Sequence, residues 1–363
     1  MTVKRFLENF PVSNLEKSCE GYPHLVKRSR ITIQDVASKA GVAISSVSRV
    51  LSGHLDVSEK MRMKVLAAVE ELAYEPDHLA QSLRTGTTNT IGFLIRDITN
   101  PLFSIVAQSA EQQLRKSGYS MILINSDGDI ETEKVNFALF KRRRVDGVIA
   151  SLVSEDAPYV QKTIKELGAP IVLLDREVTG LDASAVICDH RSGVQQATTS
   201  LLNLGHRKIA FVSGKADVYI TRNQINGFED AFNQIKVAVD PNLIRLGKFG
   251  EKFSYDQVLD LCRGENRPTA LIAGGIGAST GALRALKELN LIAGKDVAFV
   301  ALDEWPMFDV LTDHLSSVYR DPEEMGRQAA RLILAVILGE PPSHSIVPTH
   351  YRERSSSFAI KND

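Results

Sequence analysis

The chain has 363 residues, of which 44% are hydrophobic, so it can hold two or three domains with apolar cores. Its 43 basic and 44 acidic residues nearly cancel, which excludes a polycation that coats nucleic acid or membranes along its whole length. The longest apolar run, residues 332–338, is far shorter than the roughly 18 residues needed to span a bilayer, so no membrane segment is expected.

Residues 1–30 contain neither an apolar segment of the signal-peptide type nor a helical period, and we expect a flexible extension there. Cys19, Cys188 and Cys262 are widely spaced and odd in number, which favours a reducing cytoplasm over a disulfide-forming compartment. Neither the cysteines nor the eight histidines have metal-ligand spacing, and no Walker-type sequence occurs. We therefore predict no metal and no cofactor.

Residues 31–76 predict helices only. Thr32 followed by Asp35 resembles a capping box at the start of a first helix, which Gly41 ends. A second helix is predicted over residues 44–51, and a third follows it, which together give helix-turn-helix spacing. The apolar positions expected in the core of these helices are Val36, Ala37, Ala40, Val47, Val50, Leu51, Val65, Leu66, Val69 and Leu72.

The second helix of a helix-turn-helix lies in the major groove, with its N-terminal residues against base edges. Arg49 can donate a bidentate pair to guanine, Ile44 can contact a thymine methyl, and Ser45 can donate or accept. An ordinary bundle of capped helices would explain the spacing equally well, but eight basic residues against three acidic ones between residues 27 and 64 favour DNA. The positions predicted to contact DNA in this unit are Thr32, Ile44, Ser45, Ser46, Ser48, Arg49 and Ser52.

After Gly86 the pattern changes to short apolar runs that alternate with amphipathic segments of helical length. This alternation is typical of parallel sheets covered by helices. About 275 residues are too many for one such sheet, so we expect two similar α/β lobes. The predicted strands are residues 91–95, 119–124, 148–152, 171–174, 209–212, 270–273 and 297–302.

Several segments carry a specific resemblance to a known family. In the head they are residues 32–37 (TIQDVA), 40–42 (AGV), 47–51 (VSRVL) and 72–76 (LAYEP). In the body they are residues 100–103, 143–147, 174–176, 204–211 and 281–286. Over residues 31–357 the chain resembles the LacI family of transcriptional regulators. This implies a small all-α helix-turn-helix head and a two-lobed α/β body with parallel sheets, similar to periplasmic sugar-binding proteins.

The resemblance also implies a domain order. Residues 77–88 match the family's hinge helix and linker, residues 89–357 its effector domain, and residues 358–363 form a short tail. In the family the hinge helix forms on DNA and a leucine wedges into the minor groove. Leu83 falls at that position, followed by Arg84, and both are predicted to contact DNA. Packing of Leu83 into the body as an ordinary linker residue is the alternative.

The family's ligand lies in the cleft between the lobes, and the resemblance carries its site onto this chain. Asp303 and Arg222 match positions that often bind ligand hydroxyls or carboxylates, for which a carboxylate and a guanidinium are suited. The competing interpretations are a turn residue for Asp303 and a surface-helix residue for Arg222. The predicted effector-binding residues are Phe103, Ser151, Asp175, Arg222, Asp303 and Arg320.

The chain departs from the family at three places. Ala43 stands where a serine usually caps the recognition helix, which removes a cap and a phosphate contact. Residues 274–276 are Gly-Gly-Ile where Ala-Asn-Asp is common, and Arg320 stands where Gln is usual. The last two departures predict an anionic effector, such as a sugar acid or a sugar phosphate, in place of a neutral sugar.

Two other classes of protein explain less of the chain. A solute-binding protein of a transport system would share the body but would not carry the helical head. A sugar-metabolising enzyme needs a reactive constellation, and Gly275, Gly277 and Gly281 resemble a dinucleotide fingerprint only with the wrong spacing. We therefore predict a cytoplasmic regulator without enzymatic activity, in this family most commonly a repressor. It would bind a palindromic double-stranded DNA operator as a homodimer, under the control of a sugar or sugar derivative.

Overall fold

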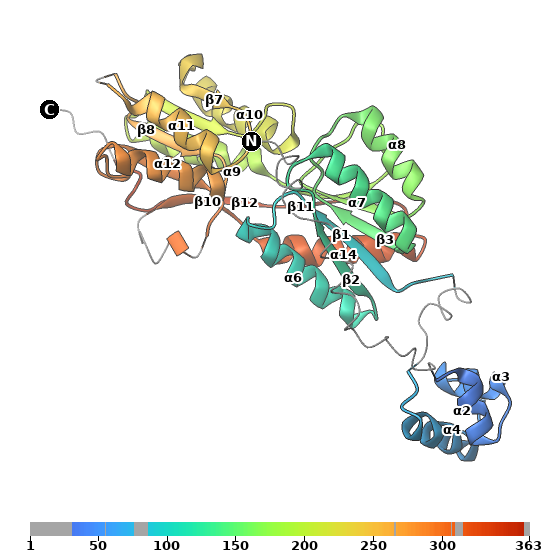
Figure 1. The fold of residues 1–363 in the computed structure, drawn as a ribbon. Coiled ribbons are helices and arrows are strands. Elements are labelled where there is room, and N and C mark those ends of the chain that lie inside the picture. Colours follow the sequence, from blue (N-terminus) through green and yellow to red (C-terminus); the bar gives the residue numbers. More distant parts are fainter. Residues whose placement is uncertain are drawn as a thin grey trace, which may run out of the picture. The chain divides into compact units, whose positions relative to one another are not determined.

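The structure is a computed structural model in which the chain forms two compact units (Figure 1). The boundary between them in the sequence lies between Gly86 and Thr87. It describes residues 31–54, 56–75, 86–264, 266–305, 307–308 and 315–358. The predicted N-terminal extension, the hinge helix with Leu83 and Arg84, and nearly all of the predicted tail lie outside the described residues. Within the described ranges, no helix combines the length and apolar composition needed to cross a membrane.

The N-terminal unit contains the three predicted helices, α2 (Ile33–Ala40), α3 (Ile44–Leu51) and α4 (Glu59–Glu71). The capping box is confirmed, because the Thr32 N–H donates to Asp35 Oδ2 at 2.8 Å and the Asp35 N–H donates to Thr32 Oγ1 at 3.4 Å. Gly41 ends α2 with a left-handed φ of 66°, which a residue with a side chain rarely adopts. Helix α3 starts behind Ala43 without a side-chain cap, as the sequence predicted.

The core of this unit is formed by one face of each helix. Val36, Val47 and Val65 have no solvent exposure, and Tyr74 closes the cluster. Leu66 was predicted in this core, but 46% of its surface is exposed, and Ala68 is buried in its place. The reason is geometric: each residue turns a helix by about 100°, so the residue next to Val65 points away from the core and the one three positions later points back.

The second unit has two lobes, each built on a six-stranded sheet. Lobe 1 has the strand order β11-β5-β4-β3-β1-β2 and lobe 2 the order β12-β10-β9-β8-β6-β7. All neighbouring strands are parallel except β10 and β12, so the predicted fold class is confirmed with one antiparallel strand at the edge of lobe 2. The alternating helices pack on both faces of these sheets (Figure 1).

The elements of lobe 1 are β1 (Thr90–Ile95), α6 (Pro101–Lys116), β2 (Ser120–Asn125), α7 (Ile130–Arg143), β3 (Gly147–Ala150), α8 (Ala157–Leu167), β4 (Ile171–Leu174), β5 (Ser184–Cys188), α14 (Pro322–Ile337) and β11 (His344–Val347). The elements of lobe 2 are α9 (His190–Asn203), β6 (Ile209–Ser213), α10 (Tyr219–Gln234), the short 3-10 helix η3 (Pro241–Leu243), β7 (Ile244–Leu246), α11 (Glu251–Cys262), β8 (Ala270–Ala273), α12 (Ile276–Glu288), β9 (Ala298–Leu302), β10 (Ser316–Arg320) and β12 (Thr349–Arg352). All seven predicted strands are present. The near-continuous apolar sequences of the inner strands follow from burial on both faces, whereas β2 lies at the edge of its sheet and is partly exposed.

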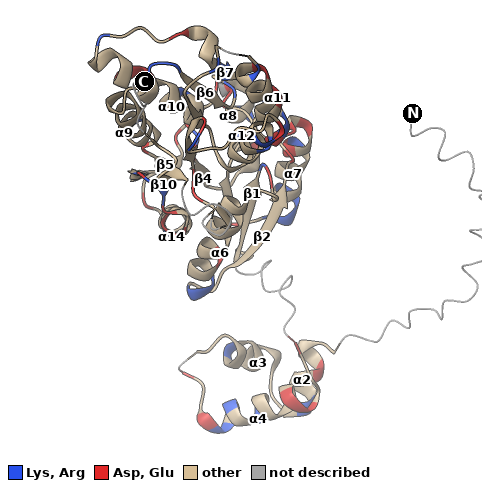
Figure 2. Ribbon diagram, turned by 90° about the vertical axis from the view of Figure 1, so that its left-hand side faces the viewer, with Lys and Arg blue, Asp and Glu red and all other residues tan. Residues whose placement is uncertain are grey.

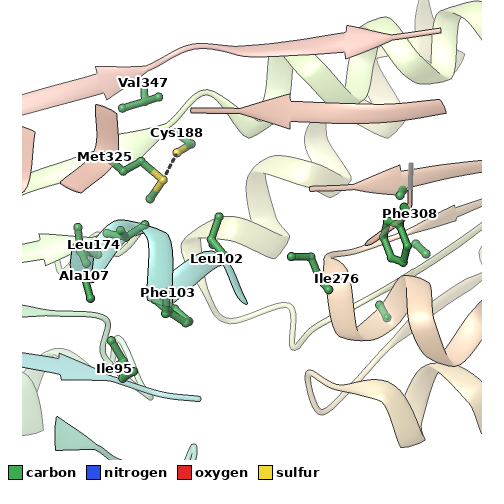
Figure 3. Packing of buried hydrophobic residues seen from close by; sticks show 14 of the residues in the cluster. Ile95, Leu102, Phe103, Ala107, Leu174, Cys188, Ile276, Phe308, Met325 and Val347 are labelled. Atoms are coloured by element: carbon green, nitrogen blue, oxygen red, sulfur yellow. Dashed lines mark hydrogen bonds between the residues drawn. The ribbon is translucent and has the colours of Figure 1, made fainter. Parts of the chain in front are cut away.

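The chain crosses between the lobes three times, and each crossing is a single residue: Asp189, Asp321 and Pro348. Asp189 links the first crossing to the third, because its N–H donates to Val347 O at 3.0 Å and its carbonyl accepts from Thr349 Oγ1 at 2.6 Å. One continuous apolar cluster lies beside the crossings and takes side chains from both lobes, as Figure 3 shows. The lobes are therefore connected over a narrow region with a cleft beside it.

Three helix pairs inside the lobes pack backbone against backbone through a glycine. A Cβ atom added at Gly326 of α14, Gly227 of α10 or Gly281 of α12 would overlap a main-chain carbonyl oxygen of the helix packed against it, which is α6, α9 or α11 respectively. Glycine at these positions allows the helix axes to approach more closely than side chains permit. The interior of each lobe is fixed by contacts that cannot adjust through side-chain rotation.

Replacement of Gly281 by alanine is expected to lower the free energy of unfolding by about 1–3 kcal/mol, because the new methyl group must push α12 away from α11. Urea unfolding measures the change. Lys287→Ala, at an exposed position of the same helix, is the control and should stay within about 0.5 kcal/mol of the parent. Equal effects of the two substitutions would contradict the backbone contact.

Candidate functional site

A cavity of about 570 Å³ lies between the lobes and takes its walls from both of them. This volume is in the range of small-molecule sites. Five of the six predicted effector residues line it, namely Phe103, Ser151, Asp175, Asp303 and Arg320. Arg222 is not among the lining residues.

The topology of the sheets brings these residues together. Ser151 directly follows β3, Asp175 follows β4, Asp303 follows β9, and Arg320 is the last residue of β10. The carboxyl ends of parallel strands meet at one edge of a sheet, where ligands bind in open α/β folds. Because the two sheets face each other with these edges, residues far apart in the sequence surround one cavity.

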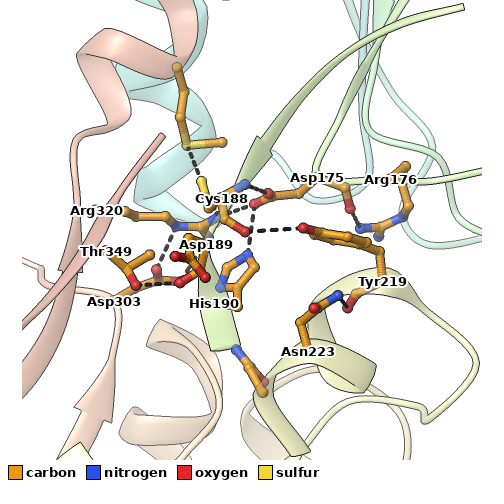
Figure 4. Close-up of polar contacts among 12 residues, drawn as sticks. Asp175, Arg176, Cys188, Asp189, His190, Tyr219, Asn223, Asp303, Arg320 and Thr349 are labelled. Atoms are coloured by element: carbon orange, nitrogen blue, oxygen red, sulfur yellow. Dashed lines mark hydrogen bonds and ion pairs between the residues drawn. The ribbon is translucent and has the colours of Figure 1, made fainter. Parts of the chain in front are cut away.

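A buried charge cluster contributes Asp175, Asp303 and Arg320 to the lining of the cavity. Figure 4 shows its contacts. Arg320 donates to both oxygens of Asp303, at 2.7 and 3.0 Å, and its third nitrogen contacts Asp175 of lobe 1. Asp175 also accepts the N–H of Cys188 at 2.8 Å, and His190 Nε2 lies 3.3 Å from its second oxygen. One guanidinium thus holds a carboxylate from each lobe.

Each charge in this cluster is kept by its partners. Burial alone would raise the pKa of Asp175, but Arg320 and His190 lower it far below its usual value. Burial alone would lower the pKa of Arg320, but Asp303 and Asp175 hold it well above its usual value. Both aspartates have positive φ angles, 48° for Asp175 and 82° for Asp303, which are uncommon for residues with side chains and accumulate at functional sites.

The cluster bears on two sequence predictions. Arg320, in place of the usual Gln, was expected to favour an anionic effector, but in the structure its charge is balanced by two carboxylates. Donor atoms of Asp175, Cys188 and His190 lie within 4.8 Å of one another, as in a metal site. Burial and the charge of Asp175 raise the pKa of the Cys188 thiol, which disfavours the thiolate that a metal needs. The carboxylate of Asp175 is already in contact with Arg320. The three residues are therefore suited to a guanidinium and not to a metal cation.

A second charged contact joins the lobes at the edge of the cleft. Glu155 of lobe 1 accepts the N–H of Tyr219 at the start of α10 at 2.7 Å and pairs with Arg222 of the same helix at 2.9 Å. Its side chain is only 5% exposed. The carboxylate therefore caps a helix of lobe 2 and occupies the guanidinium that was predicted to meet a ligand. Sequence patterns gave no signal for Glu155.

Residues 274–276, which follow β8, lack the Asn-Asp pair that the family commonly has there, and other residues occupy the space. A Cβ atom at Gly274 would overlap the side chain of Ser213, whose hydroxyl donates to Gln224 Oε1 at 2.7 Å. Gln224 lies on α10, is buried and lines the cavity. The glycine makes room for this serine–glutamine pair, so Gln224 supplies an amide in a region where the family commonly has an asparagine from another strand.

In the N-terminal unit, α3 presents the predicted contact face. Ile44 is 45% exposed, Ser45 and Ser52 are exposed, and Ser46 and Ser48 are half-buried. The side chain of Arg49 is exposed and forms an ion pair with Asp56, a partner that the sequence did not indicate. The hydroxyl of Thr32 donates to Asp35 at 2.7 Å within the capping box.

Acidic residues balance the basic ones in the described part of this unit (Figure 2). Much of the positive surplus that favoured DNA comes from Lys27, Arg28 and Arg30, which lie outside the described residues. The helix-turn-helix geometry and the exposed face of α3, and not the charge of the folded unit, therefore carry the assignment to DNA.

Comparisons with known proteins decide the family. Residues 32–77 match bacterial regulatory proteins of the lacI family, and residues 198–357 match a periplasmic binding protein-like domain. The HTH-type transcriptional regulator RegA of Clostridium saccharobutylicum is 32% identical over 311 residues, which cover 84% of this chain and 92% of that one. The chain belongs to the LacI family. The ribose operon repressor of Haemophilus influenzae is a further relative, 29% identical over 84% of this chain and 91% of its own.

Solved structures of LacI-type proteins have the same fold. The lac repressor dimer bound to operator and an anti-inducer has a TM-score of 0.80, with 24% identity over 91% of this chain and 100% of that one. A LacI family regulator from Enterococcus faecium with bound ribose has a TM-score of 0.67, with 27% identity over 75% of this chain and 100% of that one. The LacI-type chain is thus a DNA-binding transcriptional repressor and not an enzyme.

We expect Arg49→Ala to weaken binding to the operator by about 1–3 kcal/mol and to relax selectivity at one base position, because the bidentate base contact predicted for Arg49 would be lost. Binding to operator variants changed one base pair at a time measures both effects. Lys39→Ala, which removes a charge from α2, is the control and should leave base selectivity intact. Equal weakening on every DNA sequence would contradict base readout by Arg49.

Gly274→Ala is expected to destabilise the protein by about 1–3 kcal/mol, because the added methyl group overlaps Ser213. Since the overlap includes the Ser213 hydroxyl, the same substitution should cost less in a Ser213→Ala background. Urea unfolding of the single and double variants gives the coupling energy. Strict additivity would show that the two residues do not compete for space.

Proposed function

We propose that this repressor binds a palindromic operator as a homodimer and that a sugar or sugar derivative in the cleft sets its affinity for that operator. The cavity carries the proposal, because its walls come from both lobes. A ligand that contacts both walls binds best at one angle between the lobes and so biases their conformational equilibrium. This bias is the physical means by which a small molecule would act on DNA binding.

Relatives support both partners. Curated relatives include ribose operon repressors, and similar solved structures contain ribose in a regulator from Enterococcus faecium and cellobiose in the regulator CelR. The lac repressor, which has the same fold, is a dimer on its operator in its solved structure. Two-fold symmetric operators require two heads related by the same symmetry, and a homodimer supplies them.

We assign ligand contacts to Phe103, Ser151 and the polar cluster of Asp175, Asp303 and Arg320, all of which line the cavity. Phe103 offers an apolar ring that is nearly buried in the first turn of α6, and the polar groups are suited to sugar hydroxyls. Arg222 would have to leave Glu155 to reach a ligand. We therefore propose that it takes part only in a state in which that contact is broken.

On the DNA side, we assign base contacts to Ile44, Ser45 and Arg49 and phosphate contacts to the short polar residues around them. Leu83 and Arg84 lie outside the described residues. We propose, from the family resemblance, that they contact the minor groove at the centre of the operator.

Selection of binding sites from a random double-stranded DNA library by the full chain tests the proposal. The expected product is a site with two inverted half-sites, and an effective sugar should change the affinity for that site by about 5- to 150-fold. Arg49→Ala should lose the preference at one base position of each half-site while keeping sugar binding. Recovery of single half-sites would contradict the dimer, and sugar binding without a change in operator affinity would contradict the coupling.

A further inference from the structure

We propose that Arg96 is the anion-binding residue of the cleft, so that the effector is a polyhydroxylated molecule with one carboxylate or phosphate group. The proposal rests on the proposed effector site and adds a chemical class to it. Arg96 directly follows β1 of lobe 1 and lines the cavity. Sequence patterns did not point to this residue, since it belongs to no motif that was singled out.

The guanidinium of Arg96 is largely unpaired. Its Nε donates to Ser151 Oγ at 3.4 Å, and no other hydrogen bond or ion pair of Arg96 is found in the described part of the chain. An arginine has five N–H donors, so most of them remain available. Arg320, by contrast, is held by two carboxylates, and Lys248 at the cavity wall is exposed and therefore less desolvated than Arg96.

The position of Arg96 is fixed by an aromatic ring from the other lobe. Its guanidinium carbon lies 5.0 Å from the ring centroid of Phe249, between β7 and α11. The ring in turn packs on Gly214, where a Cβ atom would overlap it. Arg96 is thus half-buried and oriented in the cavity before any ligand binds, which reduces the entropy lost on binding.

The charged groups around Arg96 do not fully balance the positive charge of its guanidinium. Burial and the charge of Arg176 lower the pKa of Arg96 well below its usual value, and the carboxylates of Asp175, Asp97 and Glu133 only partly oppose them. The closest of these in sequence, Asp97, is engaged by Thr99, whose N–H and hydroxyl donate to it at 2.9 and 2.6 Å. An anionic group on Arg96 would complete the ion pair that the protein does not supply.

The other polar residues that line the cavity indicate that the effector carries hydroxyl groups as well as an acidic group. Gln224, Ser151 and the cluster around Asp303 offer acceptors and donors suited to hydroxyl groups. An effector with several hydroxyls and one acidic group would use both kinds of wall at once. The anionic effector predicted from the sequence is thereby retained, with Arg96 in the part that Arg320 was expected to take.

Isothermal titration of the full chain with matched pairs tests the proposal: D-glucose against D-gluconate and D-glucose 6-phosphate, and D-ribose against D-ribose 5-phosphate. At least one acidic compound should bind about tenfold or more tighter than its neutral parent, since a charge-assisted hydrogen bond contributes that much. The carboxylate and phosphate arms identify the acidic group. Inorganic phosphate alone should bind far more weakly, because it lacks the hydroxyls.

Arg96→Gln should remove the preference for the acidic compound, and Arg96→Lys should retain part of it. Arg191→Gln is the matched control, because this arginine is exposed, pairs with Asp230 and does not line the cavity.

Equal weakening of the acidic compound and its neutral parent in Arg96→Gln would mean that Arg96 only packs on Phe249, which overturns the proposal. Neutral sugars that bind as tightly as their acids would overturn it too while leaving the effector site intact. No binding by any compound, with operator binding preserved, would contradict the effector site itself.

Discussion

The guanidinium of Arg320 between Asp175 and Asp303 is the contact on which the effector unit depends. It joins a carboxylate of each lobe at the point where the chain crosses between them. Burial of three charges carries a large desolvation cost, which is offset only because the pair with Asp303 is bidentate and Asp175 has further donors. Loss of one partner would leave an uncompensated buried charge, so the three residues act as one unit. All three residues line the cavity.

Among the contacts that join the lobes in the described residues, three from different parts of the cleft differ in chemistry. Arg320 with Asp175 is buried, Glu155 with Arg222 is half open to water, and Arg96 meets only the face of Phe249. Any change in the angle between the lobes must break or exchange at least some of these contacts. A ligand that offers hydroxyls competes for the first, and one that offers an acidic group complements the third. The free energy that couples ligand to lobe angle is therefore concentrated in a few polar side chains.

Sequence patterns predicted the parts of the structure that depend on local burial. Strands buried on both faces, such as β1 and β9, are continuous apolar runs, whereas β10 and β12 contain serine, histidine and arginine and were not predicted. Five cavity residues were found because the family resemblance carried their positions onto this chain. Their partners could not be predicted, since Arg320 and Asp175 are 145 positions apart and only the folded topology joins them. The roles of Glu155, Gln224 and Arg96 were not predicted for the same reason. Leu66 shows that helical periodicity alone can assign a residue at the border of a helix face to the core.

The glycine contacts within the helix pairs have a mechanical consequence. Main-chain atoms in direct contact cannot be compressed or rotated aside, so each lobe should move as a rigid body. Deformation is then left to the three single-residue crossings, two of which, Asp189 and Asp321, also cap helices α9 and α14. A displacement of a few tenths of an ångström at the cavity would not dissipate inside a lobe. Because the lobe rotates as one body about the crossings, the displacement at the cavity would also move the end of the lobe farthest from them.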